Sequence, residues 1–179
     1  HRGLDLIDLK TMSTIAIPSA DDALSKYIHR GTYMLYNDAH GCLWVSTDNT
    51  VEKLEFDAEG KVIKVHELKS ANMSTKAINA YCEIDGNLLM GFGNSLMKAH
   101  TDNSGHVRLK PYIQNTPSMP GTNYIISLTT KDHEVWIGTN DGLLRYNPAK
   151  HILRRYAHSD NGNHTLTQNL ITNLQVTAD

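Results

Sequence analysis

Short apolar runs bounded by turn residues dominate the hydrophobic pattern of the chain. The clearest pair is 135–138 and 143–146, which flank the turn Asn140-Asp141-Gly142. Apolar, β-branched and aromatic residues favour strands, and Asn, Asp and Gly tolerate the positive φ angles of tight turns. The pattern therefore predicts a hairpin of two short strands. No segment shows apolar residues spaced three and four apart, so no helix is predicted.

The same hairpin recurs twice upstream, at intervals of about 46 residues. Its leading position is Trp44, Leu89 or Trp136. A small residue follows two positions later in each copy, namely Ser46, Gly91 and Gly138. A propeller blade of four strands needs ~40–50 residues, so the sequence predicts an all-β fold made of four-stranded antiparallel blades. About four periods fit into the chain, and propellers close with ~4–8 blades, so we expect a segment of a larger propeller.

Turn residues divide the chain into blades. Residues 1–17 are predicted to form the outer half of a blade, residues 30–68, 77–113 and 124–156 three complete blades, and residues 170–179 the first strand of a further blade. The strands of the complete blades are predicted at 32–37, 43–46, 51–56, 62–68, 77–84, 88–91, 95–100, 107–112, 124–130, 135–138, 143–146 and 152–156. Because the inner strands are continuously apolar, we expect both faces of each sheet to be covered.

The small residues of the repeat have a predicted packing role. We expect Ser46, Gly91 and Gly138 to mark places where adjacent blades approach closely. The large rings of Trp44 and Trp136 are predicted to fill the wider gap between blades.

Residues 132–148 resemble a known repeat. The run Val-Trp-Ile-Gly-Thr-Asn-Asp-Gly-Leu-Leu-Arg-Tyr-Asn-Pro is similar to the two-component regulator propeller repeat. The other copies depart from it, with Thr50 in place of the turn glycine, Leu89 in place of Trp, and Phe92 in place of Thr. The resemblance covers nearly the whole chain and implies the periplasmic sensor region of a hybrid two-component histidine kinase, with seven blades.

This resemblance implies a function and its partners. The chain would be an extracytoplasmic sensor segment of a membrane-anchored protein, recognising an oligosaccharide and signalling to a kinase domain outside this chain. It would lie in the periplasm as part of an inner-membrane protein, against the remaining blades and neighbouring domains, with a homodimer left open. Two alternatives remain: a passive platform for protein assembly, and a propeller lyase that uses His and a divalent metal.

Composition and charge say little about which class of partner the chain binds. The chain is 40% hydrophobic and 20% charged, and its formal net charge is −2. A net charge near zero gives no electrostatic reason for binding nucleic acid, so no nucleic-acid partner is predicted. No stretch approaches the ~20 apolar residues that cross a bilayer.

Catalytic and metal-binding motifs are not found in the sequence. It contains no nucleophile elbow and no phosphate-binding glycine loop, so the segment is predicted to be no enzyme and to need no cofactor. The ten His residues lack metal-ligand spacing, although His158 and His164 flank Asp160 in one loop. Two separate thiols are favoured over a disulfide for Cys42 and Cys82.

Ligand-binding residues are expected where strand-two turns meet the links between blades, because this face surrounds the propeller channel. Arg would pair with an anionic group and Tyr would stack on a sugar ring. The candidates are Arg30, Tyr33, Asn49, Asn94, Tyr124 and Asn140. The alternative is that these residues are solvated, and that the Asn and Asp residues only adopt left-handed turn conformations.

Overall fold

The computed structural model divides the chain into two compact units, His1–Ala77 with Thr101–Arg108, and Ile78–His100 with Leu109–Asp179. It describes residues 4–29, 31–47, 50–68, 78–101, 106–113, 124–160, 162 and 165–177, without the side chains of residues 33 and 101. Each unit is built around its own hydrophobic core.

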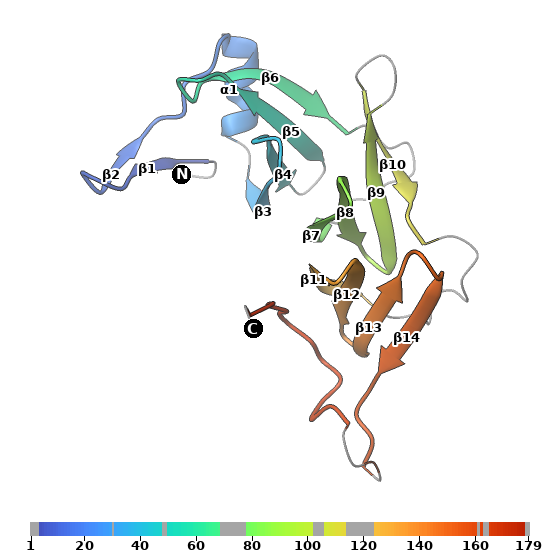
Figure 1. The fold of residues 1–179 in the computed structure, drawn as a ribbon. Coiled ribbons are helices and arrows are strands. Elements are labelled where there is room, and N and C mark those ends of the chain that lie inside the picture. The colour runs from blue at the N-terminus through green and yellow to red at the C-terminus, as the bar shows by residue number, and fades with distance from the viewer. Residues whose placement is uncertain are drawn as a thin grey trace. The chain divides into compact units, whose positions relative to one another are not determined.

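The first unit contains a hairpin, a helix and a four-stranded sheet (Figure 1). The hairpin pairs β1 (Leu6–Asp8) with β2 (Ser13–Ile15), and α1 (Asp22–Ile28) follows. Blade one is the antiparallel sheet β3 (Thr32–Asn37), β4 (Leu43–Thr47), β5 (Val51–Phe56) and β6 (Val62–Glu67), in that order. Its core is formed by Leu4, Ile28, Val45, Leu54 and Val62.

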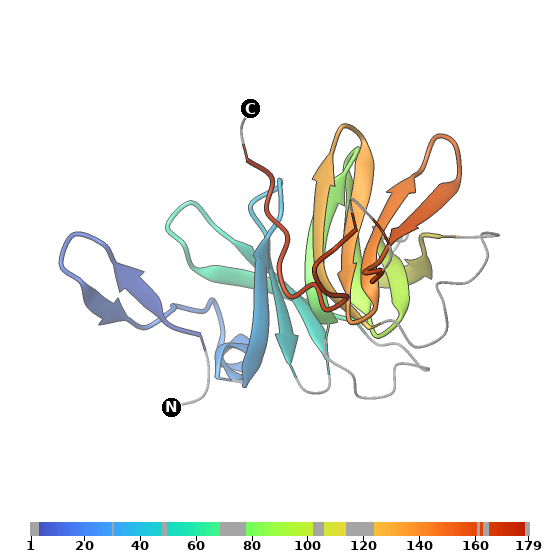
Figure 2. The same cartoon turned by 90° about the horizontal axis from the view of Figure 1, so that it is seen from below.

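Two further four-stranded sheets follow along the chain. Blade two consists of β7 (Ile78–Ile84), β8 (Asn87–Phe92), β9 (Ser95–Thr101) and β10 (Val107–Pro111). Blade three consists of β11 (Ile125–Lys131), β12 (Glu134–Thr139), β13 (Gly142–Asn147) and β14 (Ile152–Tyr156). Strand β11 packs beside β7 and β8 in the second unit (Figure 2). One core joins the two sheets, with Ala80, Cys82, Ile84, Leu89 and Leu96 against Ile125, Leu128, Val135, Ile137, Leu144 and Tyr146.

All twelve predicted blade strands are present, and each end lies within one residue of its predicted position. The inner strands β4, β8 and β12 are buried along almost their whole length. This burial confirms that both faces of these strands are covered, as their continuous apolar runs indicated. The two strands of the first hairpin contain three residues each.

The helix α1 contradicts the prediction that the chain contains no helix. Asp21 caps its first turn by accepting a hydrogen bond from the backbone N–H of Ala23. Leu24 and Ile28, four residues apart, pack against the core of the first unit. The helix has only seven residues, and apolar spacing over so short a segment is too little for a periodic signal.

Residues 170–177 are the described part of the strand predicted at 170–179, and they form no strand, because no described strand lies beside them to complete a ladder. Its backbone is fixed at one point, where the N–H of Ile171 donates to the carbonyl of Thr139 at 2.9 Å.

Two glycines of the repeat lie at close contacts, as predicted. A β-carbon on Gly91 would come 2.5 Å from Cγ2 of Ile125, the first residue of blade three. A β-carbon on Gly138 would come 2.8 Å from Cγ2 of Ile171, which lies 46 positions after Ile125. The same small-residue contact is therefore repeated in successive copies. The third small residue, Ser46, is fully buried.

Candidate functional site

One end of the second unit carries three of the predicted binding residues, and we call it the turn end. The backbone N–H of Tyr124 donates to Oδ1 of Asn140 at 2.8 Å, and the N–H of Asn140 donates to the carbonyl of Tyr124 at 3.3 Å. The N–H of Ile125 donates to the carbonyl of Gly93 at 2.7 Å, next to Asn94. Antiparallel order places each strand-two turn at the end where its blade begins, so these residues gather there.

The structure therefore brings together three of the six predicted residues. Tyr124 is 46% exposed, and Asn94 is also exposed and accepts a hydrogen bond from Ser95 through its side chain. The side-chain oxygen of Asn140 instead holds the start of blade three. Arg30 and Asn49 lie outside the described residues. Tyr33 lies in β3, and its side chain is also outside the described part.

In the two strand-two turns that are fully described, the Asn and Asp residues are not left-handed, contrary to the expectation; Asp48 and Asn49 lie outside the described residues. In the β12–β13 turn only Gly142 has a positive φ, of 110°. Thr139 closes this turn, because its hydroxyl donates to the carbonyl of Gly142 at 2.7 Å and accepts from the N–H of Asp141 at 3.0 Å. In blade one the hydroxyl of Thr47 likewise donates to the carbonyl of Thr50 at 3.2 Å, but it accepts from the N–H of Thr50 itself, at 3.1 Å.

Blade two has Phe92 at the position of these threonines and cannot make such bonds. Its turn instead places Gly93 at a φ of 56°, a conformation that glycine adopts at no steric cost. The least regular copy of the repeat therefore reaches the same hairpin by a different local mechanism.

A polar network fixes the chain that follows blade three to the turn end. Arg155 pairs with the carboxylate of Asp141 at 2.7 Å. The side-chain amide of Asn169 donates to the same carboxylate at 3.4 Å, and its backbone carbonyl accepts from the N–H of Gly142 at 2.7 Å. These residues are far apart in the sequence, and the sequence pattern gave no sign of the network.

His158 continues this network. Its Nδ1 lies 2.6 Å from the carbonyl oxygen of Leu166, and its Nε2 lies 2.9 Å from a carboxylate oxygen of Asp160. Only a protonated ring donates from both nitrogens. The carbonyl of Leu166 first, and Asp160 second, accordingly raise the pKa of His158 above its ordinary value. The pairing with Asp160 gives this histidine a role in holding the loop.

A second candidate site is a small basic pocket in blade three, with a volume of about 120 Å³. We call it the blade-three pocket, and it is lined by Glu134, Arg145, Asn147, Lys150, Ile152 and Arg154. The sequence analysis missed it because its residues come from three strands and one turn, and only the strand register aligns them.

The floor of the blade-three pocket is rigidly built. Arg145 forms an ion pair with Glu134, and the side-chain amide of Asn147 donates to the other oxygen of Glu134 at 2.8 Å. The hydrogen bond from Arg145 lowers the pKa of Glu134 most, and the bond from Asn147 lowers it further. The guanidinium of Arg145 also lies over the ring of Trp136, 5.3 Å from its centroid, and this ring stacks on Tyr156.

Metal and thiol chemistry find little support in the described ranges. Among those residues no group of three or more His, Cys, Asp or Glu could hold a metal ion. Cys42 and Cys82 are both free, and burial raises the pKa of Cys82 to about 12. No helix within the described part is long and apolar enough to cross a membrane.

Comparison with known proteins identifies the fold. No protein-family model and no curated protein matches the sequence. Two structures of the extracellular domain of BT4673 from B. thetaiotaomicron, described as a one-component and as a hybrid two-component system, match with TM-scores of 0.67 and 0.69. Both are 18% identical and cover 96% of this chain and 22% of theirs. The extracellular domain of BT3049, described as a hybrid two-component system of the same organism, matches with a TM-score of 0.66. It is 16% identical, and the match covers 96% of this chain and 21% of that one.

These matches extend over nearly the whole chain and confirm the predicted fold class, a propeller segment of four-stranded antiparallel blades. The chain spans about a fifth of the length of the structures that it matches.

Proposed function

We propose that the chain is a segment of the extracytoplasmic sensor propeller of a membrane-anchored two-component signalling protein. One observation carries the proposal: over 96% of the chain, the fold matches extracellular domains described as parts of hybrid two-component systems. The repeat around Trp136 supports it independently. The segment itself is not catalytic, lies in the periplasm, and is linked to a kinase domain elsewhere in the protein. A fold hosts many functions, so the proposal needs a direct test.

The proposal includes further blades of the same parent protein, for which the β1–β2 hairpin gives physical support. Asp8 and Asn147 occupy matching turn positions, and each side chain accepts a hydrogen bond from a backbone N–H two or three residues later, at 2.8 and 2.9 Å. Met12 and His151 then adopt φ angles of 55° and 53°. The first hairpin thus repeats the β13–β14 turn, which supports residues 1–17 as the outer half of a blade.

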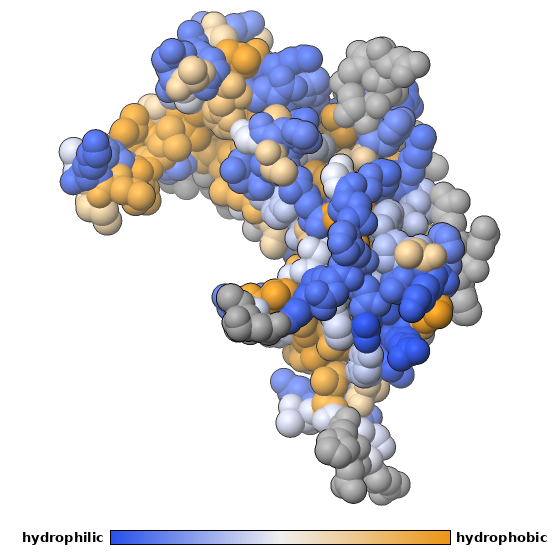
Figure 3. Space-filling view, in the orientation of Figure 1, coloured by the Kyte–Doolittle hydropathy of each residue, from blue (hydrophilic) through white to orange (hydrophobic). Residues whose placement is uncertain are grey.

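This half-blade leaves apolar side chains exposed. Figure 3 shows hydrophobic surface over the hairpin. The exposed residues are Leu6, Ile7, Leu9, Met12 and Ile15. We propose that two inner strands from the remaining blades cover them, since an isolated two-stranded sheet is only marginally stable in water.

The proposed ligand is an oligosaccharide bound at the turn end. Tyr124 is an exposed residue whose ring would stack on a sugar, and the exposed amide of Asn94 would form hydrogen bonds to hydroxyl groups. Arg30, Tyr33 and Asn49 belong to the first unit, and they stay predicted ligand-binding residues apart from the turn end. Binding would signal only if the ligand favoured one arrangement of the propeller and its neighbouring domain over another.

The test is a thermal-shift screen of the intact extracytoplasmic region against neutral and charged oligosaccharides. A ligand at a hundred times its Kd should stabilise the region by about 2.7 kcal/mol. Tyr124→Ala and Asn94→Ala should reduce the shift, whereas Glu59→Ala, in an exposed turn of blade one, should not. If no oligosaccharide changes Tm and a defined protein partner binds stably, the passive platform is the better description.

A further inference from the structure

The blade-three pocket has a charge that the protein does not neutralise. Arg145, Lys150 and Arg154 contribute three positive charges, and Glu134 one negative charge. Glu134 is committed to Arg145 and Asn147. Within the described part of the chain no carboxylate forms a salt bridge with Arg154. The pocket therefore keeps a net positive charge of its own.

The strand register makes this arrangement unfavourable without a counterion. Arg145 on β13 lies directly opposite Arg154 on β14. Like charges at directly opposed positions of a sheet repel and destabilise the pair. Glu134 neutralises the charge of Arg145 but not that of Arg154. Lys150 adds a further positive charge from the adjoining turn. An anion held between Arg154 and Lys150 would remove this repulsion.

We propose that the blade-three pocket binds a single oxyanion group, the carboxylate or sulfate of a small acidic ligand. A volume of about 120 Å³ is far below the ~300–1,000 Å³ of pockets for drug-sized ligands, so it fits one functional group. The planar fork of Arg154 matches two oxygens of such a group, and Lys150 adds a mobile point charge. Arg145 is held in place by Glu134 and Trp136, so this wall of the pocket is formed before binding.

The outer strands stay accessible when a neighbouring blade is present, as blade two shows. Its inner residues Leu89 and Gly91 are buried against blade three. Further out, Lys98, at the position of Arg145, is only half-buried, and His100 and Lys110 are exposed. By the same geometry, a blade packed on blade three would cover Gly138 and Trp136 and leave the basic pocket open at the rim.

The sequence offers a direct spectroscopic test, because the chain has two tryptophans. Trp136 lies under Arg145 in blade three, and Trp44 lies in blade one. The 179-residue protein, labelled with ¹⁵N, would be titrated at constant ionic strength with sodium glucuronate, sodium sulfate or neutral glucose. We expect the indole N–H of Trp136 to shift and saturate with an anion, while that of Trp44 stays unchanged and glucose has no effect.

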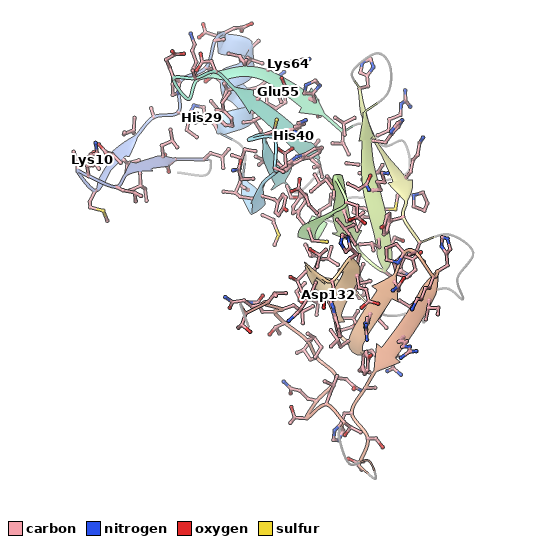
Figure 4. All side chains as sticks on the ribbon, in the orientation of Figure 1. Lys10, His29, His40, Glu55, Lys64 and Asp132 are labelled. Atoms are coloured by element: carbon pink, nitrogen blue, oxygen red, sulfur yellow. The ribbon has the colours of Figure 1, made fainter. Side chains whose placement is uncertain are left out.

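Variants assign the binding to the pocket. Arg154→Gln and Lys150→Gln should each weaken the anion Kd about tenfold or more, the effect of losing one charge-assisted hydrogen bond. Lys10→Gln removes the same charge at the tip of the β1–β2 hairpin (Figure 4) and should leave Kd unchanged.

The relative affinities for glucuronate and sulfate identify the anion: saturation by either one supports the site and names its preferred group. No Trp136 shift with either anion, or equal Kd values for the Arg154→Gln and Lys10→Gln variants, would overturn the proposal. The result is independent of the proposed sensor function, which stands or falls on the oligosaccharide screen.

Discussion

Substituting Gly91 by Ala tests the packing between blades two and three. The new β-carbon would lie 2.5 Å from Cγ2 and 3.1 Å from Cβ of Ile125, and 3.5 Å from Cβ of Ala80. Ile125 is completely buried and carries the first hydrogen bond of blade three, to Gly93, so it has little room to move. Forcing an extra carbon into a packed core costs ~1–3 kcal/mol.

The substitution also has a stabilising effect, which is smaller than this steric cost. Replacing glycine by alanine reduces the conformational entropy of the unfolded chain and stabilises the folded state by ~0.4–1 kcal/mol where the backbone permits it. The expected net loss for Gly91→Ala is therefore about 1–2 kcal/mol. Gly31→Ala is the matched control, because a β-carbon there would meet nothing within 4 Å and its φ is not positive. We expect it to leave stability unchanged or slightly raised.

The assay is urea denaturation followed by circular dichroism, with the slope of the transition checked for each variant. Ile125→Leu removes the offending Cγ2 and keeps the side-chain volume, at a cost of less than ~1.5 kcal/mol on its own. Combined with Gly91→Ala it should cost about 1 kcal/mol less than the sum of the single changes. If the two changes are additive, or if Gly91→Ala behaves like Gly31→Ala, the close contact does not limit stability.

Three further predictions follow from the local chemistry. Thr139→Ala should cost about 1–2 kcal/mol by urea denaturation, since it removes one buried and one partly buried hydrogen bond that close the β12–β13 turn, and Thr139→Ser should recover most of the loss. Since folding raises the pKa of His158, its contribution to stability should be complete below its ordinary value of 6.5 and lost as the pH rises through the raised pKa. An NMR titration of its ring would check the sign, and a pKa at or below 6.5 would refute the pairing with Asp160. At pH 7.5 a thiol reagent should label half-buried Cys42 before Cys82, whose thiol is buried with a pKa of about 12, and equal rates would contradict that burial.

The sequence located the strands well because their signals are local. Apolar runs such as 135–138 and turn residues such as Gly142 act within a few positions, and the repeat gave the same pattern three times. The local signal failed where structure depends on partners. The helix at Asp22–Ile28 is stabilised by its cap and by Leu24 and Ile28 in the core, and 170–177 has no neighbouring strand among the described residues.

The candidate sites divide in the same way. Antiparallel order alone was enough to place Asn94, Tyr124 and Asn140 at one end of the second unit. It could not show that the side chain of Asn140 accepts a hydrogen bond from the backbone N–H of Tyr124, nor that Thr139 closes the turn. These details depend on distances between atoms and not on residue type.

The sequence by itself determined the strands, the blade period and the small residues at close contacts, because residues near one another in the chain signal each strand and turn, and the recurrence of that signal gives the period. Tertiary structure decided which charges meet. Glu134, Arg145 and Arg154 form one pocket only because the register of three strands aligns them, and Arg155 pairs with Asp141 for the same reason. Electrostatic interactions act over a few ångströms in space, so they become visible only when the sheet is assembled.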